Sequence, residues 1–146
     1  MREQELGIMV GLPLSGKSRF AIGLAVDKGH IVVCPDTIRL ALHGKQFIGL
    51  AEPFVWAVAQ TMARTLLIEG YSVIIDATNT TKKRRKMWID IAKEQGVKFQ
   101  AYVLHTSREE CHERNRRLDR LDGSVIDRMA DQWEEPSQDE LKGVRQ

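Results

Sequence analysis

Cysteine is scarce in this chain, and the cysteines that occur form neither a metal pattern nor a disulfide pattern. Cys34 and Cys111 are the only two, and they lack the C-x-x-C spacing of zinc sites. The four histidines also lack ligand spacing and a paired cysteine. We therefore expect no zinc site and no disulfide framework, and a reducing, cytoplasmic setting fits best.

Long apolar runs and repeats are missing as well. A charged N-terminus, residues 1–5, leads directly into a short apolar segment, and no stretch resembles a signal peptide or a membrane span. No internal repeat is visible, and a length of 146 residues suits one domain. We expect a single domain over residues 1–146, with a polar, loose tail at about 136–146.

An excess of one charge is the third absence, because the formal net charge is only +2. A charge this small does not by itself indicate a polyanionic partner. Basic residues nevertheless gather in two places, at 82–86 and between 114 and 120. The distribution of charge is therefore more informative than its sum.

What the sequence does contain is the phosphate-binding P-loop pattern G-x-x-x-x-G-K-S. Its residues are Gly11, Leu12, Pro13, Leu14, Ser15, Gly16, Lys17 and Ser18. In such a loop the backbone N–H groups surround phosphate, the lysine reaches the β- and γ-phosphates, and the hydroxyl ligates Mg²⁺. An ordinary glycine-rich turn is the alternative, but a strand pattern at 6–10 and a helical pattern at 19–26 supply the setting that the motif requires. The pattern predicts ATP and Mg²⁺ as cofactors.

Strand and helix patterns alternate along the rest of the chain. Strands are expected at 6–10, 31–34, 71–75 and 97–104, and helices at 19–26, 37–42, 52–69, 81–95, 107–118 and 124–133. This alternation predicts an α/β, three-layer P-loop NTPase fold, with a parallel sheet of about four strands, flanking helices and a helical lid. Ligands of such sheets bind beyond the carboxyl ends of the strands.

Asp36 and Arg39 follow the second expected strand and share one face of a helical turn. An aspartate near the γ-phosphate can accept a proton from an attacking hydroxyl, and the arginine can hold an anionic part of the acceptor. A helix-capping aspartate with a paired surface arginine is the alternative. The P-loop upstream favours the functional interpretation.

Asp76 ends the third expected strand and is followed by Thr78 and Asn79. A carboxylate at this position can hold Mg²⁺ or its waters together with Ser18, or orient the acceptor. The alternative is a cap for the next helix, but Thr80 or Thr81 already suits that role. We expect Asp76, Thr78 and Asn79 to belong to the substrate site.

The basic run at 82–86 has two interpretations. Part of it can contact a phosphate backbone, but a solvated helix face is the more common reason for such a run. The three tryptophans, at 56, 88 and 133, lie on helical patterns and suit core or groove packing better than base stacking.

Arginines cluster around the fifth expected helix, at positions 114, 116, 117 and 120. Guanidinium groups of a lid segment can neutralise the charge that phosphoryl transfer spreads over the transferred group. Arg114, Arg117 and Arg120 are the candidates for ATP binding, because their spacing places them on roughly one face. A helix face paired with nearby carboxylates is the alternative.

Taken together, these motifs resemble the P-loop kinase family, and within it the 5′-kinase domain of phage-type polynucleotide kinases. The resemblance covers about residues 6–136 and is carried by the P-loop, Asp36-x-x-Arg39, Asp76-Ala77-Thr78-Asn79, and Arg114-Asn115 before a Val125-Ile126-x-x-Met129 pattern. It implies that Asp36 is the general base, that Arg39 contacts the phosphate of the acceptor, and that Asp76 fixes the acceptor or the P-loop. It also implies that Arg114 and one of Arg117 or Arg120 hold the ATP phosphates. The spacing after Asn115 departs from the phage pattern and does not fix the second arginine.

We therefore expect an ATP-dependent kinase whose catalytic residues are Asp36, Lys17, Arg39 and Arg114. The resemblance implies that the acceptor is the 5′-OH of a DNA or RNA end. Two alternatives stay open: a small-molecule or nucleotide kinase of the same fold, and an ATP-binding switch without an acceptor. Asp36 argues against the switch, because a switch needs no base for an alcohol.

Overall fold

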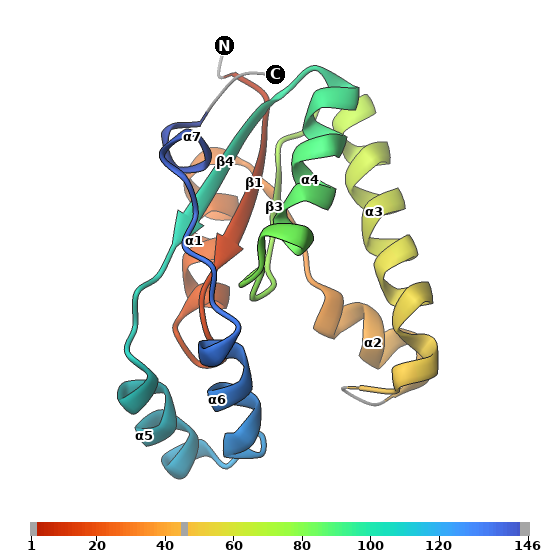
Figure 1. Cartoon of the computed structure of the whole chain (residues 1–146). Helices are drawn as coiled ribbons and strands as arrows, with labels where there is room; N and C mark the ends of the chain where they lie inside the picture. Colours follow the sequence, from red (N-terminus) through yellow and green to blue (C-terminus); the bar gives the residue numbers. More distant parts are fainter. Residues whose placement is uncertain (1–2, 45–46, 144–146) are drawn as a thin grey trace.

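The computed structural model describes residues 3–44 and 47–143, and a parallel sheet lies at its centre. Within these residues the strands are β1 (Glu5–Val10), β2 (Ile31–Val33), β3 (Val73–Ile75) and β4 (Lys98–Val103). They lie in the order β2-β3-β1-β4, and each neighbouring pair is parallel (Figure 1). The predicted α/β fold with a four-stranded parallel sheet is confirmed.

Helices connect the strands and extend beyond them. They are α1 (Lys17–Lys28), α2 (Pro35–His43), α3 (Glu52–Ile68), α4 (Lys82–Gln95), α5 (Arg108–Leu118), α6 (Gly123–Asp131) and α7 (Gln138–Lys142), with a 3₁₀ turn, η1 (Gly49–Ala51), before α3. Three of them begin at hydroxyl caps: the side chains of Thr81, Ser107 and Ser137 accept hydrogen bonds from backbone N–H groups in the first turns of α4, α5 and α7.

The alternation of side chains along β1 produces the three layers. Leu6, Ile8 and Val10 face α3 and α4, whereas Met9 packs on the opposite face against Ala21 of α1. Strands that are buried on both faces read as continuous apolar runs, which is why β1 and β3 carry almost no polar residues. Because all neighbouring strands are parallel, their carboxyl ends lie at one edge of the sheet.

The α5–α6 pair lies at that edge and has a small core of its own. Leu12 of the P-loop packs with Cys111 of α5 and Ile126 of α6. The two helices lie at the edge where the arrows of β1 and β4 end (Figure 1). They occupy the place of the expected helical lid, directly beside the phosphate-binding loop.

Part of the segment expected as a loose tail at 136–146 is helical in the structure. A capping box between Ser137 and Glu140 starts α7, and α7 packs against β4. The carboxylate of Glu140 also accepts a hydrogen bond at 2.7 Å from Nε of Arg85, whose side chain is fully buried. Residues 144–146 lie outside the described part of the chain.

A second buried polar cluster lies at the amino end of β1, far from the P-loop along the strand. The carboxylate of Glu5 accepts a hydrogen bond from the Tyr102 hydroxyl at 2.7 Å and lies 3.0 Å from Nε2 of His30. Burial alone would raise the pKa of Glu5, but the hydrogen bonds with His30 and Tyr102 outweigh it, so the pKa lies below its usual value. This cluster stabilises the fold as long as Glu5 is ionised.

Within the residues that the structure describes, no helix is both long enough and apolar enough to cross a lipid bilayer.

Candidate active site

The P-loop connects β1 to α1 in a strained geometry that suits an anion. Gly16 has a φ of 103° and Leu14 a φ of 66°, both in the left-handed region. A Cβ on Gly11 would lie 2.6 Å from Oγ of Ser15, so this position has no room for a larger residue. The backbone N–H of Gly11 donates to the carbonyl of Thr78 at 3.0 Å, which ties the loop to the end of β3.

Lys17 and Ser18 begin α1 and face the end of β3. Nζ of Lys17 donates to the carbonyl of Leu12 at 2.7 Å. Burial lowers the pKa of Lys17, and the negative charge of Asp76 opposes that shift. The lysine is therefore held inside the loop, close to where phosphate charge would be placed.

The hydroxyl of Ser18 donates to Oδ2 of Asp76 at 2.7 Å. This pair joins the start of α1 to the end of β3, and both oxygens are hard donors of the type that Mg²⁺ prefers. The donor set fits a magnesium ion, which Ser18 and Asp76 would hold and which would neutralise charge on the phosphates of a nucleotide. The alternative of a helix cap for Asp76 does not apply, because Thr81 caps α4.

Across from the loop, α2 and α3 present a network of ionised side chains. Nη1 of Arg39 donates to Oδ1 of Asp36 at 2.6 Å, and its Nε and Nη2 donate to the carboxylate of Glu52 at 2.8 and 2.7 Å. The hydrogen bond to Glu52 raises the pKa of Arg39 and lowers the pKa of Glu52. The Asp36 side chain stays 74% exposed, so its second oxygen is accessible to an acceptor.

The lid arginines differ in their positions. Nη1 of Arg114 donates to the carbonyl of Leu14 at 2.9 Å, and its Nη2 contacts Glu110 at 3.0 Å. Arg114 and Arg120 line the cleft described next, whereas exposed Arg117 is not among the described residues that line it. The geometry thus favours Arg120 over Arg117 as the second lid arginine.

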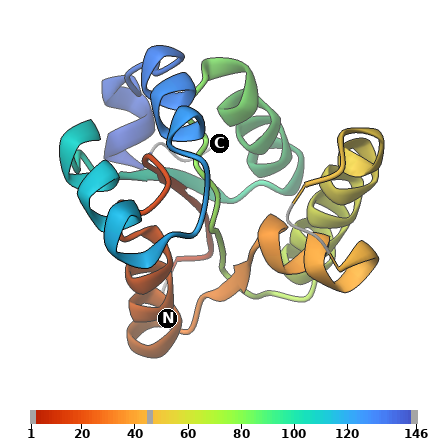
Figure 2. The same ribbon diagram turned by 90° about the horizontal axis from the view of Figure 1, so that it is seen from below.

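These groups converge on one cleft of about 970 Å³ at the carboxyl ends of the strands. Figure 2 looks at this edge, with α5 and α6 on one side and α2 and α3 on the other. The charged and polar residues that line the cleft include Lys17, Ser18, Asp36, Arg39, Glu52, Asp76, Thr78, Arg114, Arg120 and Arg128. The cleft therefore brings together most of the side chains that the sequence singled out.

Asn79 has a different place from the one expected. It is 1% exposed, and its amide donates to the carbonyl of Met9 at 2.8 Å. Among the described residues it does not line the cleft, so it holds the end of β3 against β1 rather than facing a substrate. Thr78 does line the cleft, and it also binds the P-loop through its carbonyl.

The basic run at 82–86 is not uniformly a solvated helix face. Arg85 is fully buried and donates to the carbonyl of Asn79 at 3.0 Å as well as to Glu140. Arg84 is half-buried and lies over the ring of Trp56, 3.8 Å from its centroid. Only the lysines of the run are exposed.

Sequence reasoning missed several residues of the cleft wall. Phe47, Glu52, Trp56 and Arg128 line the cleft, but none stands in a motif. The pairing of Glu52 with Arg39 depends on how α2 packs against α3, which no local pattern encodes. Trp56 fits the expectation of groove packing for the tryptophans.

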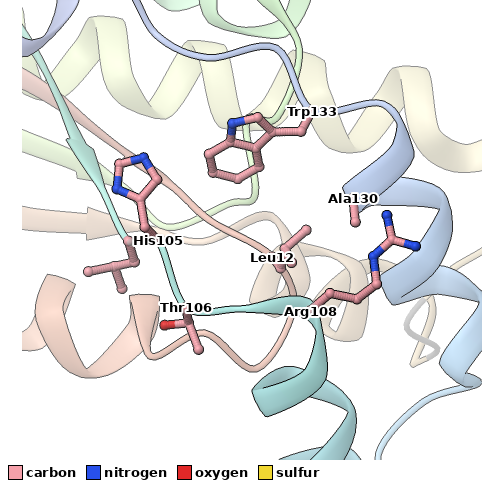
Figure 3. A pocket seen from close by; sticks show the side chains of 7 residues that line it. Leu12, His105, Thr106, Arg108, Ala130 and Trp133 are labelled. Atoms are coloured by element: carbon pink, nitrogen blue, oxygen red, sulfur yellow. The ribbon is translucent and has the colours of Figure 1, made fainter.

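A second, smaller hollow, separate from the large cleft, is lined in part by Leu12 of the P-loop. Its volume is about 190 Å³, and the side chains of His105, Thr106, Arg108 and Trp133 surround it (Figure 3). Glu135 binds both the His105 ring and the Trp133 indole at 2.6 Å. This hollow shares only Leu12 with the P-loop, and it contains none of the residues that line the large cleft.

The fold and the cleft define a P-loop kinase domain, and comparison with known proteins gives the family. A family model described as an AAA domain matches residues 6–136. The chain belongs to this family of P-loop kinase domains, which confirms the resemblance found in the motifs. P-loop kinases of this type bind ATP, typically with Mg²⁺.

Individual relatives include both polynucleotide-processing proteins and small-molecule kinases. The chain is 32% identical over 112 residues to a bifunctional polynucleotide phosphatase/kinase of Schizosaccharomyces pombe, which covers 77% of this chain and 24% of the relative. A chain of the Pnkp1/Rnl/Hen1 RNA repair complex superposes with a TM-score of 0.79 at 24% identity, over 90% of this chain and 44% of the other. The APS kinase CysC of Mycobacterium tuberculosis, solved with AMPPNP and APS, superposes with a TM-score of 0.69 at 18% identity, over 94% and 86%.

The lengths of these relatives limit what carries over to this chain. It spans about a quarter of the S. pombe protein and less than half of the RNA repair chain. At 24% and 18% identity, the two solved structures support the fold alone.

Proposed function

We propose that this protein transfers the γ-phosphate of ATP to the 5′-OH of a DNA or RNA end. The observation that carries the proposal is the position of Asp36, which faces the P-loop across the cleft that Ser18 and Asp76 also line. A base for an alcohol and a phosphate-binding loop are thus placed in one cavity.

In this mechanism the P-loop N–H groups and Lys17 hold the β- and γ-phosphates, and Arg114 and Arg120 approach them from α5 and the residues after it. A bound Mg²⁺, held by Ser18 and by Asp76, would neutralise charge on the phosphate oxygens.

Asp36 accepts the proton of the acceptor hydroxyl as the new O–P bond forms and the bond between the γ-phosphorus and ADP breaks. Arg39 orients the carboxylate of Asp36 through the hydrogen bond of 2.6 Å. Glu52 in turn fixes the guanidinium of Arg39 with two hydrogen bonds.

Two observations support a nucleic-acid acceptor. The relative of 32% identity is named as a polynucleotide phosphatase/kinase. The cleft is also open and is lined by five arginines: Arg19, Arg39, Arg114, Arg120 and Arg128. Such a surface suits a phosphate backbone better than a neutral polyol.

The test is the transfer of labelled γ-phosphate from ATP with Mg²⁺ to an acceptor panel of 5′-OH DNA, 5′-OH RNA, nucleosides, sugars and sugar acids. We expect label on the oligonucleotides. The Asp36→Asn variant should still bind ATP but transfer phosphate about 10²–10⁴-fold more slowly. Asp139→Asn, an exposed aspartate on α7, is the matched control and should keep full activity.

Label on a small molecule but not on oligonucleotides would replace the polynucleotide acceptor with a small one. Full transfer activity in Asp36→Asn would show that Asp36 is not the base.

A further inference from the structure

Helix α3 is apolar on the side that faces solvent as well as on the side that faces the core. Its buried residues recur every four positions: Val55, Ala59, Ala63 and Leu67. Because successive residues of a helix turn by about 100°, the side opposite to these carries Phe54, Ala57, Thr61, Thr65 and Ile68. All five are exposed, Phe54 to 71% and Ile68 to 67%. These five residues are the outer stripe of α3.

The outer stripe contains no charged residue, although surface helices usually carry their charges on the solvent side. The neighbouring helix α4 shows that usual pattern, since each of its exposed residues is charged: Lys82, Lys83, Lys86, Asp90, Lys93 and Glu94. In Figures 1 and 2 no element that the structure describes covers the side of α3 that faces away from the sheet. A helix that is apolar all round is typical of one that is buried on both sides. The outer stripe therefore indicates an interface.

The pattern of the outer stripe is the same when it is read from either end. Thr61 is its centre, the small residues Ala57 and Thr65 lie four positions away on either side, and the large residues Phe54 and Ile68 lie seven positions away. A second, antiparallel copy related by a two-fold axis at Thr61 thus places Phe54 against the partner's Ile68, and Ala57 against the partner's Thr65. Two-fold interfaces require this kind of self-complementary surface.

The distribution of charge around the outer stripe also favours an antiparallel pair. No like charges meet at the axis, because the residues there are uncharged. Arg64, at the border of the stripe, is already paired with Glu94 of the same chain at 2.8 Å. Exposed Glu69, which follows α3, would lie near the positively polarised N-terminus of the partner helix, where a carboxylate is stabilised.

We propose that the outer stripe is the contact between two copies of this chain, packed as antiparallel α3 helices around a two-fold axis at Thr61. Helix α3 has 17 residues. A helix pair of this length makes a contact about 25 Å long and about 10 Å wide, which is smaller than the roughly 800 Å² that each partner buries in a standard interface. The dimer is therefore weak and depends on concentration. Glu52 and Trp56, which line the cleft, lie on the core-facing half of α3, so the dimer leaves both clefts open.

Sedimentation velocity at increasing protein concentration tests this dimer. The wild type should change from monomer to dimer between about 10 µM and about 1 mM. Thr61→Lys and Thr61→Glu each place two like charges at the axis, and each should weaken the dimer roughly 10- to 100-fold. Both variants should fold, because lysine and glutamate have a higher helix propensity than threonine. Lys83→Glu, a charge reversal on the exposed side of α4, is the control and should associate as the wild type does.

An equimolar mixture of Thr61→Lys and Thr61→Glu tests the position of the axis. Opposite charges then meet at the axis, so the two variants should form a mixed dimer at least as stable as that of the wild type. A wild type that stays monomeric over the whole concentration range would overturn the second copy as the occupant and leave the stripe to a different apolar partner. A dimer that persists in both single variants, or a mixture that stays monomeric, would overturn the axis at Thr61.

Discussion

Removal of the Glu140 side chain should destabilise the whole domain, although α7 is short and lies far from the cleft. Glu140 is the ion-pair partner of Arg85, whose side chain has no solvent exposure, and the pair links α7 to the α4 layer. Arg85 also donates to the carbonyl of Asn79, which follows the strand end that carries Asp76. Among the residues that the structure describes, the Glu140→Ala variant therefore leaves a buried cation whose remaining hydrogen-bond partner is the carbonyl of Asn79.

The expected magnitude follows from the burial of the pair. Removal of one partner of a buried ion pair typically costs about 3–5 kcal/mol, because the remaining charge is neither hydrated nor paired. Arginine does not lose its proton to escape that cost. A domain of this size has a free energy of unfolding of about 5–15 kcal/mol, so the loss is a large fraction of the total. With an m-value of about 2 kcal/mol per molar urea, the midpoint should fall by roughly 2 M.

Urea unfolding followed by tryptophan fluorescence measures this shift. Asp90→Ala is the control, because Asp90 pairs with Lys86 on the exposed face of α4 and its loss should barely move the midpoint. Glu140→Gln keeps a hydrogen-bond acceptor and should fall between the wild type and Glu140→Ala. If Glu140→Ala and Asp90→Ala unfold at the same urea concentration, the buried pair does not stabilise the domain.

Two further predictions concern the metal site and the pH dependence of stability. Asp76→Asn should raise the Mg²⁺ concentration that gives half-maximal transfer by about 10- to 100-fold, since Asp76 is proposed to hold the ion with Ser18; an unchanged Mg²⁺ dependence would remove Asp76 from the metal site. Because the pKa of Glu5 is lowered on folding, ionised Glu5 stabilises the protein above its unfolded pKa of about 4.5, and this contribution is lost as the pH falls through the folded pKa. Glu5→Gln should thus unfold more easily than the wild type at pH 7, and the difference should shrink below pH 4.5; a constant difference across that range would contradict the assignment.

Much of the fold could be predicted because its signals are local. Short apolar runs ended by polar residues predicted the four strands. The alternation of these runs with helical patterns predicted that the strands are parallel. The P-loop predicted both its own conformation and the placement of Ser18 opposite Asp76, because strand ends of a parallel sheet meet at one edge.

What could not be predicted depends on contacts between distant segments. Arg85 looked like one residue of a basic surface run, but Glu140, 55 positions away, pairs with it in the interior. The same contact helps to explain why Gln138–Lys142 form a packed helix although their composition is polar. Asn79 looked like a site residue because it follows Asp76, but it turns inward to β1.

The residues that line the cleft beside Arg39 could not be predicted from the sequence for the same reason. Glu52 and Trp56 stand in no motif, and their places beside Arg39 follow from how α2 packs against α3. The spacing of the lid arginines left Arg117 and Arg120 as equal candidates, and the position of the residues after α5 favours Arg120.

The most direct test of the central claim uses one oligonucleotide in two forms, with a 5′-OH and with a 5′-phosphate, each incubated with γ-labelled ATP and Mg²⁺. The account predicts that only the 5′-OH form gains label, that phosphatase treatment of the 5′-phosphate form restores labelling, and that the label lies on the 5′-terminal nucleotide after nuclease digestion. Equal labelling of both forms, or ATP turnover without label on either, would contradict it.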